Sequence, residues 1–309
     1  MKNVKMRFPL MLTGALVLGM VYSTSCNKNE DPGLPPIGGY NNSNEVAASN
    51  SVAHWTFDGT NNETMANLAP TTAVGASFTT GVKGQGLQLT NGYILYPALT
   101  ALANANALNS ASLSGWVKVS NNGVGPTSFL ALTQSTTAQS DWNTGPLMMM
   151  AENGKPTSVD DTLVLKGVFS TWVAGARLGG DNINDFGVRE TDFKTVKTGG
   201  NWVHVVVRYD ASGSFIDIFA NGVRVSNNNF RHRTRNSGGA DVDMGPIVTV
   251  PPVQAVIGAF PNAASGFTNS ATQTWQHPMT GSLDELRVYS KALTDDEIKA
   301  LYDLEKAGR

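Results

Sequence analysis

The sequence predicts an all-β fold, a jelly-roll sandwich of two antiparallel sheets with one short C-terminal helix. Short runs in which apolar and polar residues alternate recur along the chain, and Gly and Asn residues separate them. A helical pattern is clear only near the C-terminus. Many short strands divided by turn residues are typical of sandwiches, because each sheet buries one face against the other.

The first 26 residues have the composition of an export signal. A basic stretch precedes an apolar run over 8–22, which is too short for a membrane-spanning helix, and the only cysteine of the chain, Cys26, follows. A cysteine in this place resembles the lipobox of bacterial lipoproteins, although Ser23 stands where an aliphatic residue is usual. The resemblance implies lipidation of Cys26 and a cell-surface or outer-membrane location, with membrane contact through the lipid anchor alone. An ordinary cleaved signal is the alternative.

The segment 27–50 combines low hydrophobicity with Pro and Gly, which predicts a flexible linker without a core of its own. The remainder, 51–309, has the length of one large all-β domain. With a single cysteine, no disulfide forms within the chain. A net charge of −2 and 15% charged residues offer no extended basic face, so we expect no nucleic-acid partner. The oligomeric state is left open.

Five runs before the C-terminus are predicted strands: 112–119, 148–150, 163–169, 202–209 and 215–220. In 202–209 every second residue is Val or Tyr, as expected of a strand with one buried face. The run 148–150 is three methionines, which we interpret as a buried strand. Asn221 and Gly222 suit a type I′ turn, which predicts a hairpin into 223–225.

A last strand, 283–289, leads into the predicted helix. Strict alternation would place Leu283, Glu285, Arg287 and Tyr289 on one face of this strand, and Asp284, Leu286 and Val288 on the other. Thr294 and Glu297 have the spacing of a capping box, and Leu293 and Ile298 that of a hydrophobic staple. The pattern therefore predicts a helix that begins directly after Thr294.

Four segments, in this order, resemble those of a known family. They are 54–59 (His-Trp-Thr-Phe-Asp-Gly), 84–89 (Gly-Gln-Gly-Leu-Gln-Leu), 201–222 (Asn-Trp-Val-His at its start, Asn-Gly at its end) and 283–298. The chain resembles the laminin-G-like, concanavalin A-like jelly-roll domains of secreted bacterial proteins, over residues 51 to 303. The stretches 121–180 and 226–252 match no family segment. Because rim loops of a sandwich tend to carry binding specificity, we expect specificity there.

The resemblance implies a structural calcium ion. In the family, the aspartate of the closing strand often binds calcium, which corresponds to Asp284 as a side-chain ligand. Asp58 and Gly84 would complete the site from the other end of the chain. Calcium takes oxygen ligands in a flexible cage, which carboxylates and backbone carbonyls supply. The alternative is that Asp284 only caps a turn.

The same resemblance makes a carbohydrate, a glycan or surface polysaccharide, the expected ligand. Sugar sites combine an aromatic platform with polar side chains, and the candidates are Trp142, Trp172 and Trp275 for the platform and Arg177, Arg231 and His277 as donors. Packing at the core or rim is the alternative role for each. Trp55, Trp116 and Trp202 lie in segments that resemble the family and are assigned to the core for that reason, and His204 is expected to be structural.

We expect the chain to be non-catalytic. Jelly-roll glycosidases place carboxylates at every second position of one strand, on either side of the sugar bond. Glu190 and Asp192 form one such pair, but Lys194 stands where the third acidic residue would be. Asp241 and Asp243 form another pair, in a predicted loop. The sequence therefore predicts a glycan-binding module. A protein-interaction or adhesion module is the second hypothesis, and a glycoside hydrolase is the third.

Overall fold

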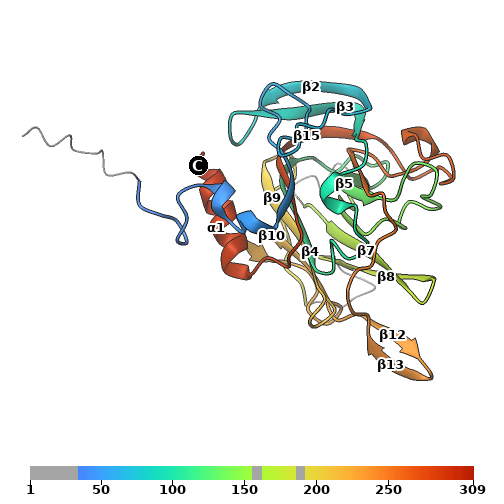
Figure 1. Cartoon of the computed structure of the whole chain (residues 1–309). Helices are drawn as coiled ribbons and strands as arrows, with labels where there is room; N and C mark the ends of the chain where they lie inside the picture. The colour runs from blue at the N-terminus through green and yellow to red at the C-terminus, as the bar shows by residue number, and fades with distance from the viewer. Residues whose placement is uncertain (1–33, 155–161, 186–191) are drawn as a thin grey trace, which may run out of the picture. The chain divides into compact units, whose positions relative to one another are not determined.

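The computed structural model describes residues 34–154, 162–185 and 192–309, which form an antiparallel β-sandwich with one short C-terminal helix (Figure 1). Hydrogen bonds connect 13 strands of this part into one sheet, which curls so that its halves face each other. Layer A contains β1 (Ser51–Trp55), β15 (Met279–Tyr289), β4 (Ala111–Lys118), β9 (Val203–Asp210), β10 (Phe215–Ala220) and β11 (Val223–Arg224). Layer B contains β14 (Gln254–Ile257), β5 (Thr127–Thr133), β6 (Leu147–Ala151), β7 (Leu165–Val173) and β8 (Ala176–Ile183). The predicted all-β sandwich is confirmed.

The hairpin of β2 (Thr72–Thr80) and β3 (Gln85–Leu95) joins the two layers. β3 pairs with β15 of layer A over its first part and with β14 of layer B at its end. Between these parts the backbones of Gly75 and Gly92 approach closely. A Cβ atom would lie 2.4 Å from a carbonyl oxygen at Gly75 and 2.3 Å from one at Gly92. Because β3 pairs with both layers, the two predicted sheets are one curled sheet.

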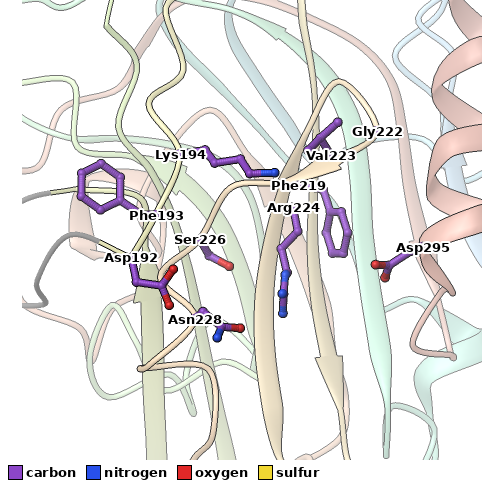
Figure 2. Close-up of a pocket in the computed structure, with 10 residues that line it drawn as sticks. All are labelled: Asp192, Phe193, Lys194, Phe219, Gly222, Val223, Arg224, Ser226, Asn228 and Asp295. Carbon is purple, nitrogen blue, oxygen red and sulfur yellow. The ribbon is translucent and has the colours of Figure 1, made fainter.

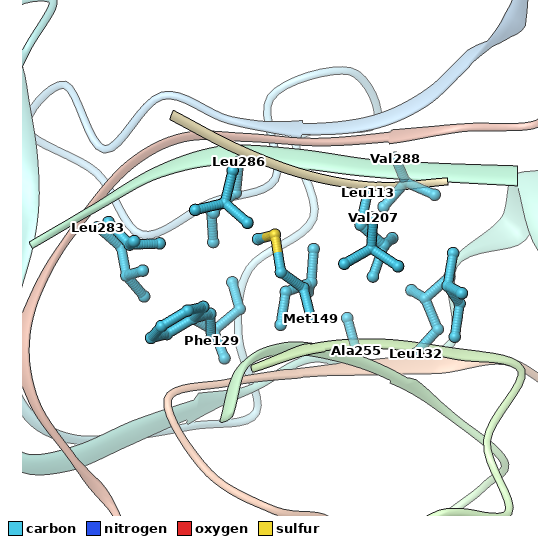
Figure 3. Packing of buried hydrophobic residues seen from close by; sticks show 14 of the residues in the cluster. Leu113, Phe129, Leu132, Met149, Val207, Ala255, Leu283, Leu286 and Val288 are labelled. Carbon is cyan, nitrogen blue, oxygen red and sulfur yellow. The ribbon is translucent and has the colours of Figure 1, made fainter. Parts of the chain in front are cut away.

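The main core fills the space between the layers (Figure 3). It includes Leu113, Phe129, Leu132, Met149, Val207, Ala255, Leu283, Leu286 and Val288. Trp55 and Trp116 are buried, as predicted. Trp202 is only half-buried, and its assignment to the core was wrong because it lies one residue before β9 at the end of the sheet. The predicted methionine strand is β6, and it is buried throughout.

A β-bulge interrupts the alternation predicted for β15. The register with β4 shifts between Asp284 and Arg287, and Glu285 has a φ of +47°. The extra residue places Leu283 and Leu286, three positions apart, in the same core. Glu285, Arg287 and Tyr289 consequently lie on the outer face of layer A.

The helix α1 (Asp295–Lys306) packs on that outer face. Its capping box is present: Thr294 Oγ1 accepts a hydrogen bond from the Glu297 backbone N–H, and the Glu297 carboxylate accepts one from the Thr294 N–H. Leu293 and Ile298 are both buried, as the staple predicts. None of the described helices has the length and apolar character needed to cross a membrane.

The segment 35–50, predicted as part of a flexible linker, is folded. It contains the 3-10 helices η1 (Ser43–Glu45) and η2 (Ala48–Asn50), and Val46 is buried with the apolar face of α1. Ser43 Oγ and Asn44 Oδ1 accept hydrogen bonds from Arg287. The folded unit therefore begins before Ser51. Residues 1–33, with the predicted signal and Cys26, lie outside the described residues.

Smaller elements complete the described chain. The predicted turn is confirmed, since Asn221 and Gly222 have φ angles of +50° and +78° and connect β10 to β11. A separate two-stranded sheet projects from the sandwich (Figure 1). The remaining elements are η3 (Thr100–Leu102), η5 (Ala263–Ser265), and the strands of the projecting sheet, β12 (Thr234–Ser237) and β13 (Ala240–Asp243).

Candidate functional site

A groove on the outer face of layer B contains two of the predicted sugar-binding residues, Trp142 and Arg177. It has a volume of about 290 Å³ and is called the Trp142 groove here. It is lined by Trp142, Asn143, Lys166, Val168, Phe169, Arg177, Gly179, Gly180 and Asp181. Aromatic, apolar and charged groups thus meet in one depression.

The pairing of β7 with β8 forms the floor of the Trp142 groove. Val168 is the register partner of Asp181, and Lys166 lies two positions before Val168, so all three side chains project from the same face. Gly167 faces the other way, since a Cβ atom on it would lie 2.6 Å from Val207 of layer A. Gly179, two positions before Asp181 on β8, shares this outer face and has no side chain. A ring-shaped ligand therefore has room against the floor.

Trp142 forms the aromatic wall of the groove. Its ring packs edge-on against Trp275 at 5.3 Å between centroids and against Phe260 at 5.7 Å. Phe260 and Trp275 contact each other in the same way at 5.2 Å. Edge-to-face pairs stabilise by about 0.5–1.5 kcal/mol each beyond their area burial. Trp275, predicted as a platform, instead holds Trp142 in place.

The polar groups of the groove are only partly used by the protein. Lys166 Nζ lies 3.0 Å from Glu152 Oε1 and 3.4 Å from Asp181 Oδ2. Arg177 is exposed and donates one hydrogen bond, at 3.3 Å, to the carbonyl oxygen of Asn143. A lysine has three donors and an arginine five, so both cations keep donors for a ligand. Sequence reasoning missed Lys166 and Asp181, because only the strand register brings them beside Trp142, and it missed Asn143, the next residue in the chain.

The other predicted sugar-binding residues lie elsewhere. Trp172 faces Arg177 across the β7–β8 hairpin but does not line the groove. His277 lines a different cavity. Arg231 donates to both oxygens of Asp217, from Nε at 2.9 Å and from Nη2 at 2.7 Å. Arg231 therefore has a structural role.

Asp217 also binds two further arginines on the outer face of layer A. Arg208 donates to it at 2.8 Å, and Arg224 Nη1 lies 3.6 Å away. Burial raises the pKa of the Asp217 carboxyl, but hydrogen bonds from Arg231 and Arg208 outweigh burial and hold that pKa below its usual range. The carboxylate thus stays ionised and ties β9, β10 and β11 together.

A cavity of about 550 Å³ borders this arginine cluster (Figure 2). It is lined by Asp192, Phe193, Lys194, Phe219, Gly222, Val223, Arg224, Ser226, Asn228 and Asp295. Figure 2 shows Asp192 and Asp295 on either side of Arg224. Two carboxylates and two cations line the cavity, so their charges balance.

Among the described residues, neither of the two predicted carboxylate pairs forms a glycosidase-like site. Glu190 lies outside the described residues, whereas Asp192 lines the cavity of Figure 2. Asp241 and Asp243 lie on the exposed strand β13. Asp243 Oδ1 lies 2.8 Å from Nε2 of His232, which forms a β-bridge with Phe215 of β10. The absence of catalysis stays a prediction from the sequence.

Asp284 and Asp58 both bind backbone N–H groups of the turn before β3. Asp284 Oδ2 accepts hydrogen bonds from Val82 at 2.7 Å and Lys83 at 3.0 Å. Asp58 Oδ1 accepts one from Gln85 at 2.7 Å. These contacts bring the two predicted calcium ligands to the same turn, and each carboxylate caps it.

Gly84 belongs to this turn for a steric reason. Its φ is +67°, and a Cβ atom there would lie 2.1 Å from Asp58 Oδ1. Burial raises the pKa of Asp284 to about 7, against the lowering effect of the backbone N–H groups. Among the described residues no group of three His, Cys, Asp or Glu side chains converges as a metal site. Turn capping is the role that the described contacts give these residues, and calcium stays a prediction.

Calcium is expected to raise the melting temperature of the protein by several degrees relative to a chelator, because an ion that binds only the folded state stabilises it. Thermal melts in millimolar calcium, in magnesium and in chelator measure the effect. Asp284→Asn should lose the calcium response. Identical melts under all three conditions would exclude the ion.

A buried charge network lies between α1 and layer A. Arg287 Nη2 lies 2.5 Å from Glu285 Oε2, and Arg287 Nε lies 2.9 Å from Glu305 Oε1. Glu285 also contacts His54 Nε2 at 2.9 Å, and Trp116 donates to Glu305 at 2.9 Å. Burial would raise the pKa of Glu285, but His54 and Arg287 lower it to about 2. Burial raises the pKa of Glu305 to about 7. The network is structural, as it connects β1, β15 and α1.

No protein-family model and no curated protein matches the chain. Among solved structures it resembles the binding domain of botulinum neurotoxin DC in complex with SialylT, with a TM-score of 0.50 and 10% identity over 84% of this chain and 52% of that chain. The binding domain of botulinum neurotoxin serotype G gives a TM-score of 0.50 and 9% identity over 82% and 51%. Domain 4 of AbnA, a GH43 extracellular arabinanase from Geobacillus stearothermophilus, in complex with arabinotriose, gives a TM-score of 0.48. Its identity is 19%, and the match covers 82% of this chain and 98% of that chain. The chain spans about half the length of the toxin domains, and at these identities the toxin domains show a shared fold alone.

Proposed function

We propose that the protein is a non-catalytic carbohydrate-binding module and that the Trp142 groove is its sugar site. The observation that supports it is the Trp142 ring beside Lys166, Arg177 and Asp181, over a floor in which Gly179 has no side chain. Small-ligand sites combine an aromatic or apolar surface with a few placed polar groups. A sugar ring offers C–H groups to the indole and hydroxyl groups to the charged side chains.

The groove is also held in shape before any ligand binds. Trp275 and Phe260 hold the Trp142 ring through perpendicular ring contacts, and hydrogen bonds between β7 and β8 fix the floor. A rigid wall lowers the entropy cost of binding, which matters for a ligand with as many rotatable hydroxyl groups as a sugar. The fold comparison adds no ligand, because one fold supports many functions.

Protein interaction or adhesion is a second candidate function, and the strand β2 favours it. Among the described strands β2 pairs only with β3, and it exposes Val74 and Phe78 by 42% and 40%. A free strand edge with apolar side chains accepts a strand from another protein. A lipid anchor at Cys26 and a cell-surface location are further parts of the proposed function. Both rest on the N-terminal sequence.

Trp142→Ala is expected to weaken glycan binding at least about tenfold, which corresponds to ~1.4 kcal/mol, because the ring is the main apolar surface of the groove. A glycan array identifies a binding oligosaccharide, and titration calorimetry then compares variants. Arg177→Ala, at an exposed position, should weaken binding without altering the melting temperature. Phe78→Ala is the control, because Phe78 is an exposed aromatic residue of β2 that does not line the groove. An array without any bound glycan, or equal affinities for Trp142→Ala and the wild type, would contradict the proposal.

A further inference from the structure

A second groove lies on the outer face of layer A, where α1 does not cover the sheet. It has a volume of about 370 Å³ and is called the Trp202 groove here. The residues that form its floor are Gln88, Lys118, Trp202 and Ser282, and its rim includes Asn122 and Thr280.

The floor is a row of side chains across four neighbouring strands. Ser282 of β15 pairs with Gln88 of β3 on one side and with Lys118 of β4 on the other. Val117 pairs with Val203 of β9, so Trp202 continues the row beside Lys118. Ser282 Oγ donates to Gln88 Oε1 at 2.7 Å, which fixes the amide.

The Trp202 groove continues into a neighbouring cavity of about 270 Å³. The two share Ser120, Asn122 and Thr280 as lining residues, and the second cavity reaches Asn153 and His277. Asn153 is 2% exposed, and its Oδ1 has no hydrogen-bond partner among the described residues. The path from Trp202 to His277 therefore has an aromatic ring at one end and, beside the shared residues Ser120 and Asn122, a buried acceptor without a described partner.

The lining of this path has the chemistry of a sugar site without the charges of the Trp142 groove. Hydroxyl and amide side chains predominate, and Lys118 is the only Lys, Arg, Asp or Glu that lines either cavity within the described residues. Hydroxyls and amides both donate and accept hydrogen bonds, as sugar hydroxyls do. A carboxylated or sulfated ligand would find one cation here. An apolar peptide would find few apolar side chains beyond Trp202.

We propose that the path from Trp202 to His277 binds an uncharged oligosaccharide, longer than one sugar unit, as a second glycan site. The proposal depends on the carbohydrate-binding function proposed above. The Trp142 groove is on the outer face of layer B and the Trp202 groove is on the outer face of layer A. One molecule would thus bind two segments of a polysaccharide, or two chains, on opposite sides of the sandwich, which raises the apparent affinity for a polymer.

Affinity gel electrophoresis of the whole protein in gels containing neutral polysaccharides (arabinan, xylan, mannan and β-glucan) tests the second site. We expect Trp202→Ala and Trp142→Ala each to reduce retardation in the gel that slows the wild type, and the double variant to lose it. Titration of the wild type with a hexasaccharide from that polysaccharide should give two sites, and Trp202→Ala should give one. Trp202→Phe, which keeps a ring, should retain most of the binding, and thermal melts verify folding.

Lys118→Met provides a second variant in case Trp202→Ala does not fold, because Lys118 is exposed and its change should leave the melting temperature unaltered. It should weaken binding at this site several-fold. One site in the wild type, abolished by Trp142→Ala and unaffected by the Trp202 and Lys118 variants, would overturn this inference and keep the proposed function. Retention of a peptide or protein ligand alone would overturn both.

Discussion

Arg287→Ala is expected to lower the free energy of unfolding by about 3–5 kcal/mol, because it leaves buried acidic groups without their cation. Arg287 is 2% exposed and lies between Glu285 and Glu305, neither of which has any exposed surface. The ionised Glu285 carboxylate loses most of its hydration at this site, and the guanidinium group compensates for this loss. Removal of Arg287 leaves that cost unbalanced.

The loss should extend beyond the charges, since Arg287 connects three segments. It donates to Ser43 and Asn44 of the N-terminal segment and to Glu305 of α1. At about 2–4 °C per kcal/mol for a domain of this size, the melting temperature should fall by roughly 10 °C. Urea unfolding followed by tryptophan fluorescence measures the free energy directly.

Two further variants separate the causes of the expected destabilisation by Arg287→Ala. Arg287→Lys keeps the charge but has no planar fork to serve two carboxylates, so it should recover only part of the stability. Lys299→Ala removes an exposed ion pair with Asp303 and should change stability by less than about 0.5 kcal/mol. A structural role for Arg287 would be contradicted if the unfolding free energies of Arg287→Ala and the wild type differed by less than about 1 kcal/mol. A difference of that size is expected from measurement error and a surface effect alone.

The sequence predicts those parts of the fold that depend on local patterns. The strand before Tyr209, the turn at Asn221 and the cap at Thr294 all follow from residues within a few positions of one another, and all are confirmed. The bulge at Glu285 depends on the pairing of β15 with β4, which no local alternation reveals. The folding of 35–50 likewise depends on distant contacts, such as the hydrogen bond of Asn44 with Arg287 of β15, 243 residues away in the chain, and the packing of Val46 on α1.

The candidate site was predictable only in part, for the same reason. Trp142 and Arg177 were candidates because they are an aromatic residue and a cation in a stretch that matches no family segment. Both line the Trp142 groove in the structure. Lys166 and Asp181 became candidates only through the β7–β8 register. Trp202 was wrongly assigned to the core, because resemblance to a family segment does not reveal on which face of the sheet the residue at the end of a strand lies. Long-range pairing, rather than residue type, determines these positions.

His204→Phe is expected to make the protein less sensitive to acid. His204 is fully buried, and its Nε2 lies 2.9 Å from Ser114 Oγ. Burial lowers the pKa of this imidazole to about 3, and the positive charge of Arg287 adds to the effect. Glu305 lies 3.7 Å away but already binds Arg287 and Trp116, so it does not hold His204 in the charged form.

The sign of the expected effect follows from proton binding. Between the unfolded pKa of 6.5 and the folded pKa of about 3, the unfolded chain binds a proton at His204 that the folded protein does not. Stability is therefore fully present above pH 6.5 and decreases as the pH falls through this range, by up to about 1.4 kcal/mol per pH unit. His54, whose pKa burial also lowers, acts in the same direction.

The pH profile of the wild type alone does not isolate this effect. Burial raises the pKa of Asp284 and of Glu305 to about 7, so these two carboxyls bind protons in the folded protein that the unfolded chain has released. Their contribution is present at low pH and is lost as the pH rises toward 7, opposite to that of His204. The informative quantity is the difference in unfolding free energy between the wild type and His204→Phe at each pH.

The unfolding free energy of the wild type minus that of His204→Phe should fall steadily as the pH is lowered from 7 to 4, whatever its sign at pH 7, because the phenylalanine variant lacks the proton-binding group. Urea unfolding at five pH values measures it, and the lost hydrogen bond of Ser114 contributes only a constant offset. The imidazole resonances of His204 should meanwhile show no titration in the folded protein down to about pH 4. A constant difference across the range, or a midpoint near 6.5 in the resonances, would show that burial does not keep this histidine neutral.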